Sequence, residues 1–244
     1  MTTQLIVKED LASLSNAERA KSMAKYFQAH PGGYGEGDEY IGVTVPNQRV
    51  VSKKHFSSIT LNEIEFLLAD PIHEYRLTAL FMLVLKYKKA KSEEDKEDIV
   101  NVYLKNIDKV NNWDLVDSSA HLILGPHLIG CDRSLIHEMA ESPNLWVQRI
   151  SIITTLHFIR NNHFNETLQL SLKLINHKHD LMHKAVGWML REVGNRDFDV
   201  EYRFLAKHYR EMPRTMLRYA IEKFPEDLRQ KFLKGTIKRI STVE

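Results

Sequence analysis

Two tryptophans and one carboxylate stand at spacings that could support chemistry on a cationic group. Trp113 lies four residues before Asp117, and Trp188 lies four residues after Lys184. Positions four apart share one face of a helix, so we expect the indole of Trp113 to lie one helical turn from Asp117 and that of Trp188 one turn from Lys184. Indole faces attract cations, and a carboxylate between them would add negative charge. The alternative, in which either tryptophan only fills a helical core, stays open.

A basic residue recurs at one position in similar segments of the chain. Five segments align, and their shared position holds Arg76, Asp117, Arg149, Lys184 and Arg218. Four of these side chains are cations, and a row of cations on one face suits a phosphate backbone, because each neutralised phosphate releases counterions. A second interpretation, in which these side chains form ion pairs between helices, also stays open.

The spacing of these segments predicts the fold. The shared positions are 41, 32, 35 and 34 residues apart, which is typical of HEAT-like repeats of two helices each. Apolar residues recur at helical spacing in 61–68 and 77–85, and Thr60 with Glu63 forms a capping box. Strand signals are confined to residues 40–45. We therefore predict an all-α protein, a curved solenoid of HEAT-like helical repeats (an α-α superhelix), with residues 1–244 as a single domain.

Composition and charge narrow the class of protein. The 244 residues are 43% hydrophobic, as in globular proteins. Residues 1–122 hold 15 Lys and Arg against 18 Asp and Glu, a balance of −3, whereas residues 123–244 hold 19 against 14, a balance of +5. This basic surplus indicates a polyanionic partner on the C-terminal side. With one cysteine, no secretory signal and no apolar stretch near the roughly 20 residues of a membrane span, we expect a cytoplasmic protein that makes no membrane contact.

At the tryptophans and the carboxylate, the sequence resembles the AlkD-type alkylpurine DNA glycosylases of the HEAT-like repeat class. The resemblance rests on three strings: Asn112-Trp113-Asp114-Leu-Val-Asp117-Ser, Leu145-Trp-Val-Gln-Arg149 and Lys184-Ala-Val-Gly-Trp188-Met-Leu-Arg191-Glu192. Weaker support comes from Met23-Ala-Lys-Tyr26, Gly42-Val-Thr-Val-Pro46 and Arg49. The matching strings follow one order and span most of the chain.

The resemblance implies an enzyme that releases cationic alkylated purines, such as 3-methyladenine and 7-methylguanine, from duplex DNA. It implies no metal or organic cofactor and no flipping of the base into a pocket. In the family the motif carboxylate corresponds to Asp117, and the paired tryptophans correspond to Trp113 and Trp188. The arginine that engages the backbone at the lesion corresponds to Arg149, and Tyr26 falls where a family tyrosine lies near the lesion.

The chemistry of such a lesion suits these residue types. Alkylation at a ring nitrogen makes the purine cationic and a good leaving group, so the glycosidic bond breaks toward an oxocarbenium-like sugar. Asp117 would stabilise that charge and position a water, while the two indoles pack against deoxyribose. We therefore predict a monofunctional DNA N-glycosylase, a monomer with no obligate protein partner, that is associated with the nucleoid when bound to DNA. The predicted DNA contacts are Arg149, Lys184, Arg191, Arg76, Arg218 and Tyr26.

Two other classes of function remain as alternatives. The first is a non-catalytic HEAT-like module that binds damaged or branched DNA, and the second is a protein-interaction scaffold with no nucleic-acid role. The DNA module would share Arg149 and the basic row with the glycosylase but would not need Asp117 or the tryptophans. The scaffold would show no salt-dependent binding to DNA.

Three further motifs predict no additional site. The glycine-rich acidic stretch 32–39, within the loop region 31–46, does not fit a dinucleotide or P-loop fingerprint, and we expect a flexible surface loop. His177, His179 and His183 have a spacing that could gather a metal, but neither a His-Glu-x-x-His pattern nor cysteine supports one, so we predict no metal site. Residues 86–98 run from lysines to acids, as expected for a helix end followed by an acidic helix start.

Overall fold

The computed structural model describes residues 2–237 and is built of helices joined by short loops. No strand occurs in this part of the chain, where the extended pairing is an isolated bridge between Glu39 and Ile72. The prediction of an all-α protein is therefore confirmed. None of the helices described here combines the length and hydropathy that crossing a membrane requires.

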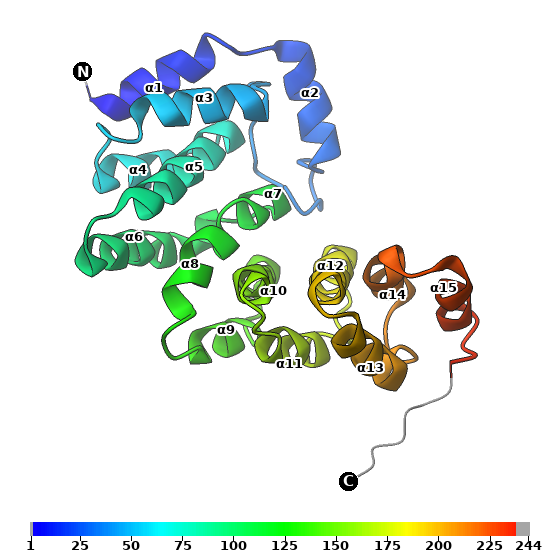
Figure 1. Ribbon diagram of the computed structural model, residues 1–244. Coiled ribbons are helices and arrows are strands. Elements are labelled where there is room, and N and C mark those ends of the chain that lie inside the picture. The colour runs from blue at the N-terminus through cyan, green and yellow to red at the C-terminus, as the bar shows by residue number, and fades with distance from the viewer. Residues whose placement is uncertain (1, 238–244) are drawn as a thin grey trace. The chain divides into compact units, whose positions relative to one another are not determined.

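The chain divides into two compact units, Met1–His127 and Leu128–Glu244 (Figure 1). Whether residues 1–244 act as one continuous repeat domain stays a prediction. The helices of the first unit are α1 (Thr3–Ala12), α2 (Ala17–Tyr26), α3 (Val45–His55), α4 (Leu61–Leu68), α5 (His73–Lys89), α6 (Glu93–Lys105), η1 (Ile107–Lys109) and α7 (Trp113–Asp117), and α8 (Ala120–Leu128) runs to its boundary.

The long helix α5 is the centre of the first unit. Nearly all of its first twelve residues are buried, including Leu80, Met82 and Leu83, and it packs against α3, α4, α6 and α7. The capping box predicted at Thr60 and Glu63 is present at the start of α4, where the two side chains satisfy each other's backbone N–H groups. Glu63 also accepts the backbone N–H of Thr3 at 2.7 Å and so ties the start of α1 to α4.

The second unit consists of two layers of helices (Figure 1). One layer holds α10 (Leu145–Arg160), α12 (Asp180–Arg196) and α14 (Arg214–Ala220), which pack one against the next. The other layer holds α9 (Ser134–Met139), α11 (Asn165–Lys173) and α13 (Phe198–His208), and η2 (Ile221–Lys223) and α15 (Glu226–Leu233) follow. This pairing of helices agrees with the predicted unit of two helices per repeat.

Each of the five aligned segments begins a helix. The shared position is the fourth or fifth residue of α5, α7, α10, α12 and α14. Side-chain caps start three of these helices: Asn112 accepts a backbone N–H at α7, Asn144 at α10 and His179 at α12. In these three helices the cap supplies a local acceptor for the first free N–H groups, whereas α5 and α14 begin without a side-chain cap.

Gly187 allows a close contact between two helices of the second unit. A Cβ atom at this position of α12 would lie 2.4 Å from the carbonyl oxygen of Met216 and 2.6 Å from the Cβ of Tyr219, both on α14. The backbones of α12 and α14 therefore touch at a point where a side chain does not fit. This contact gives the glycine of the Gly-Trp-Met-Leu-Arg-Glu string a packing reason.

We expect Gly187→Ala to lower the free energy of unfolding by about 1 kcal/mol or more, since the added methyl group must displace backbone atoms. The gain in helix propensity, about 1 kcal/mol, acts in the opposite direction and does not relieve the clash. Chemical denaturation followed by circular dichroism measures the change. Gly130→Ala is the matched control, because nothing lies within 4 Å of a Cβ built there. Equal stability of the two variants would contradict the packing argument.

Candidate functional site

Trp113 and Tyr26 lie against each other in the first unit. Trp113 opens α7, and its indole stacks on the ring of Phe27, with ring centres 5.4 Å apart. The ring of Tyr26 meets the indole edge-on at 6.1 Å and is 66% exposed. Asp117 is the last residue of the same helix, one turn from Trp113, and is partly exposed. The first unit thus presents an indole, a phenol and a carboxylate on or beside one short helix.

A buried histidine holds α7 in place. His73, the first residue of α5, lies with Nδ1 3.0 Å from Asp38 and Nε2 2.9 Å from Asp114, the residue that follows Trp113. Both acceptors are carboxylates, so both ring nitrogens of His73 donate and the ring carries a positive charge. The rings of Phe27 and Tyr40 lie 5.0 Å from it and close the space around it.

The charges around His73 balance one another: two cations, His73 and Arg76, lie beside two carboxylates, Asp38 and Asp114. Burial disfavours a charged imidazole, but the carboxylates of Asp114 and Asp38 outweigh burial and raise the pKa of His73 to about 9. Burial alone would raise the pKa of Asp38, but the neighbouring His73 and the guanidinium of Arg76 outweigh burial and lower that pKa. Nη2 of Arg76 donates to Asp38 at 2.5 Å, and both side chains are almost fully buried. The two cations and two anions form a single buried ion network.

The glycine-rich acidic loop is anchored to α5 at its end. Glu74 is fully buried, and its Oε1 accepts the backbone N–H groups of Ile41, Gly42 and Val43 at 3.2, 2.7 and 3.2 Å. Gly42 has φ +79°, and a Cβ there would lie 2.1 Å from the carbonyl oxygen of Asn16. Within the stretch 32–39 itself, Asp38 is buried and bound to His73 and Arg76, so the expectation of a surface loop is wrong at that residue.

In the second unit, Trp188 and Arg191 of α12 both lie near acidic side chains. Nε1 of Trp188 donates to Oε1 of Glu192 at 3.0 Å. Arg191 forms an ion pair with Glu222, and Nη2 of Arg191 lies 3.9 Å from Oε1 of Glu192. Burial raises the pKa of nearby Glu201 to about 9, although Arg191 acts in the opposite direction, so this carboxyl group is protonated at neutral pH. The indole and the guanidinium thus both have acidic partners.

Arg149 and Lys184 lie where α10 meets the start of α12. Arg149 is 4% exposed and donates to the carbonyl oxygen of Leu181 at 2.5 Å. Lys184 forms an ion pair with Asp180 at 2.7 Å within α12. Arg149 therefore joins two neighbouring helices through a hydrogen bond to the backbone, and the ion pair of Lys184 lies within a single helix.

The predicted basic row divides between buried and exposed side chains. Arg76 is 5% exposed and paired with Asp38, whereas Arg218 lies on the exposed face of α14. The sequence could not separate them because both occupy the same register position. A guanidinium enclosed by protein cannot reach a phosphate, so we leave Arg76 out of the proposed DNA contacts.

The histidines at the start of α12 interact with one another and with backbone. The N–H of His179 donates to Nδ1 of His177, and the ring of His183 contacts the carbonyl oxygen of His177. Burial lowers the pKa of His177 and of His179. Within residues 2–237, no group of three or more His, Cys, Asp or Glu side chains is arranged to hold a metal ion.

Sequence reasoning missed His73, Asp38 and Glu74. Asp114 stood inside the string that carried the resemblance, yet its partner His73 lies 41 residues away in the sequence. The signal that could have found the cluster is the presence of His and Glu at the start of an otherwise apolar helix. Charged residues at such positions are buried only when they are paired.

Comparison with known proteins agrees with this architecture. The sequence profile of the DNA alkylation repair enzyme family matches residues 7–224, so the chain belongs to that family. A solved structure, described as a "predicted DNA alkylation repair enzyme from Enterococcus faecalis", superposes with a TM-score of 0.65 over 87% of this chain and 97% of the other. The two sequences are 16% identical, which shows a common fold. No curated protein sequence matches significantly.

We expect the free energy of unfolding to fall as the pH rises from about 7 toward 10, because His73 loses its proton in that range. Its pKa in the folded state is about 9, above the ordinary value of 6.5. The stabilisation is therefore complete below pH 6.5 and is lost as the pH passes 9. His73→Asn removes this contribution, so its unfolding should depend less steeply on pH. His163→Asn, at an exposed histidine, is the control and should follow the parent protein. Identical pH profiles for all three proteins would show that His73 is not charged in the fold.

Proposed function

We propose that the protein is a DNA glycosylase that hydrolyses the N-glycosidic bond of cationic alkylated purines, 3-methyladenine and 7-methylguanine, in duplex DNA. Membership of the DNA alkylation repair enzyme family supports the substrate class. One structural observation carries the proposal: α7 offers a partly exposed indole and a partly exposed carboxylate one turn apart, with Tyr26 beside the indole. A carboxylate and aromatic faces suit a reaction in which positive charge develops on a sugar.

In the proposed reaction the bond between C1′ of deoxyribose and the purine nitrogen breaks, and the bonding electrons leave with the base. The alkylated base, cationic while attached, departs as a neutral molecule and needs no proton from the enzyme. Asp117 stabilises the oxocarbenium-like sugar and accepts a proton from the water that attacks C1′. A flipped-base pocket is not required, because the charge of the lesion supplies the leaving group.

The remaining aromatic residues and cations bind the duplex in this proposal. Trp113 packs against the deoxyribose, and Tyr26 lies beside the lesion, while Trp188 is the aromatic residue that the second unit offers to DNA. Lys184, Arg191 and Arg218 contact phosphates. Arg149 is 4% exposed and donates to the backbone of Leu181, so it is left out of the proposed contacts for the same reason as Arg76. The ion pairs of Lys184 and Arg191 would open or be shared when phosphate binds, so Arg218 is the most accessible of these cations. The protein would act as a monomer on DNA in the cytoplasm, without a cofactor.

We expect Asp117→Asn to reduce release of 7-methylguanine from methylated duplex DNA by about 10²-fold or more, because the variant loses the negative charge that stabilises the transition state. Chromatography of the released bases measures the rate, and fluorescence anisotropy measures DNA binding, which should persist. Asp108→Asn, at an exposed acid of η1, is the matched control. Undiminished release by Asp117→Asn would remove this carboxylate from the mechanism. A parent protein that binds methylated DNA but releases no base would favour the non-catalytic DNA-binding module.

The variants Arg218→Ala and Arg76→Ala should lose different properties: DNA binding in the first and stability in the second. Removing Arg218 should weaken DNA binding and reduce the slope of log K against log salt concentration by about 1, with little change in stability. Removing Arg76 leaves Asp38 buried with one cation fewer and should cost about 3–5 kcal/mol of stability. Salt titrations of binding and denaturation curves of both variants measure these effects. A lower salt slope for a folded Arg76→Ala protein would contradict its assignment to the interior.

A further inference from the structure

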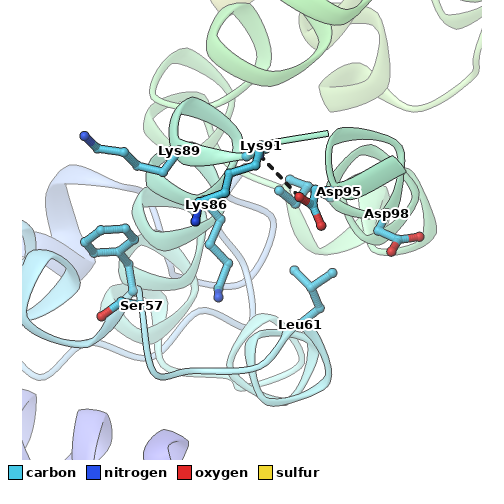
Figure 2. A pocket seen from close by; sticks show the side chains of 10 residues that line it. Ser57, Leu61, Lys86, Lys89, Lys91, Asp95 and Asp98 are labelled. Atoms are coloured by element: carbon cyan, nitrogen blue, oxygen red, sulfur yellow. Dashed lines mark hydrogen bonds between the residues drawn. The ribbon is translucent and has the colours of Figure 1, made fainter. Parts of the chain in front are cut away.

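A pocket of about 500 Å³ lies in the first unit, where the end of α5 meets the start of α6 (Figure 2). Its volume falls within the range of small-molecule sites in proteins. The sequence showed only a run of lysines followed by acids here, which ordinarily marks a solvated turn. The residues that line the pocket are Phe56, Ser57, Leu61, Lys86, Lys89, Ala90, Lys91, Asp95, Asp98 and Ile99.

Lys86 is the exceptional side chain of this pocket. It lies on α5 and extends into the space between Ser57 and Leu61, whereas Lys89 points outward (Figure 2). Within residues 2–237 its ammonium group makes no hydrogen bond or ion pair. Burial lowers the pKa of Lys86, and the nearby carboxylate of Glu63 opposes only part of that effect. Lys86 is half-buried, so its ammonium group has lost part of its hydration without gaining a hydrogen bond or ion pair from the protein, and an anion bound beside it would be stabilised.

Glu63 is not free to be that anion. Its Oε1 accepts the N–H of Thr3 at 2.7 Å, and its Oε2 accepts the N–H and the hydroxyl of Thr60, each at 2.9 Å. These bonds cap α4 and secure the start of α1, so the carboxylate cannot turn toward Lys86 without losing them. An anion that pairs with Lys86 would therefore come from outside the chain.

The other walls of the pocket restrict the kind of anion. Phe56, Leu61 and Ile99 supply an apolar lining, and Lys91 adds a second positive charge. Asp95 accepts the backbone N–H groups of Lys91 and Ser92 and closes the opposite side (Figure 2). A ligand must then place its charge at the lysines and its apolar body against the hydrocarbon walls. Free phosphate would leave those walls uncovered.

We propose that this pocket binds a small organic anion, a phosphate or carboxylate attached to one flat apolar ring, with Lys86 as its counter-ion. The site is separate from α7 and does not depend on the proposed glycosylase activity. The pocket also makes Lys86 a selective target for an aldehyde that carries a phosphate, because the bound phosphate would hold the aldehyde beside the amine. The amine attacks the aldehyde carbon, a C=N bond forms, and the carbonyl oxygen leaves as water.

Pyridoxal 5′-phosphate followed by borohydride tests the proposal on the full chain. Borohydride delivers hydride to the imine carbon and fixes the label, and peptide mass spectrometry locates it. We expect Lys86 to be labelled faster than Lys88, since burial lowers the pKa of Lys86 and so raises the neutral fraction of its amine. Phenyl phosphate should slow labelling of Lys86 at lower concentrations than inorganic phosphate, because its ring covers the apolar walls.

Matched controls separate the possible outcomes. Lys86→Leu should abolish the fast labelling, whereas Lys88→Leu, at an exposed position of the same helix, should leave it unchanged. Pyridine-4-carboxaldehyde, which lacks the phosphate, should label Lys86 more slowly. Equal labelling of Lys86 and Lys88, no protection by phenyl phosphate, or equal reactivity of the two aldehydes would overturn the proposal. Protection of Lys86 by undamaged duplex DNA would also overturn it, because the pocket would then belong to a nucleic-acid surface.

Discussion

The first unit depends on a positive charge enclosed between two carboxylates. Protonated His73 bridges Asp38 and Asp114, and Arg76 balances Asp38 from the other side. Breaking such a buried pair is costly, because the charge left behind cannot be solvated. The network therefore sets the position of α7, and with it the orientation of Trp113 and of the carboxylate one turn further along. The proposed chemistry at α7 rests on charges that themselves never meet a substrate.

The same network gives the glycine-rich loop a role. Asp38 comes from a segment that looks mobile by composition, yet it carries the acceptor that both His73 and Arg76 require. The carboxylate of Glu74 then accepts hydrogen bonds from three consecutive backbone N–H groups, at residues 41–43, which follow Asp38 in the chain. Glycine is needed at residue 42 because the backbone there has a positive φ and lies against Asn16. The loop is thus held against the start of α5, whose side chains pair with its negative charge and accept hydrogen bonds from its backbone.

In the second unit, close helix packing and compensated charge act together. Gly187 allows α12 and α14 to touch, and Arg149 joins α10 to the first turn of α12. Lys184 and Arg191 have acidic partners within the unit. Such pairing keeps the cations oriented before a phosphate arrives, and it lowers the electrostatic gain when one does. The basic surplus of this half of the chain is therefore less available to a polyanion than its net charge indicates.

The sequence by itself determined the helical class, the register shared by five segments and the capping box at Thr60, because these follow from local periodicity and from backbone groups that need nearby acceptors. Its strings also identified the family, which the profile over 7–224 confirms. Only the tertiary structure decided which cations are buried, since Arg76 and Arg218 share a register position but not a neighbour. It alone revealed His73 and Lys86, because their surroundings consist of groups brought close by folding and not by spacing along the chain.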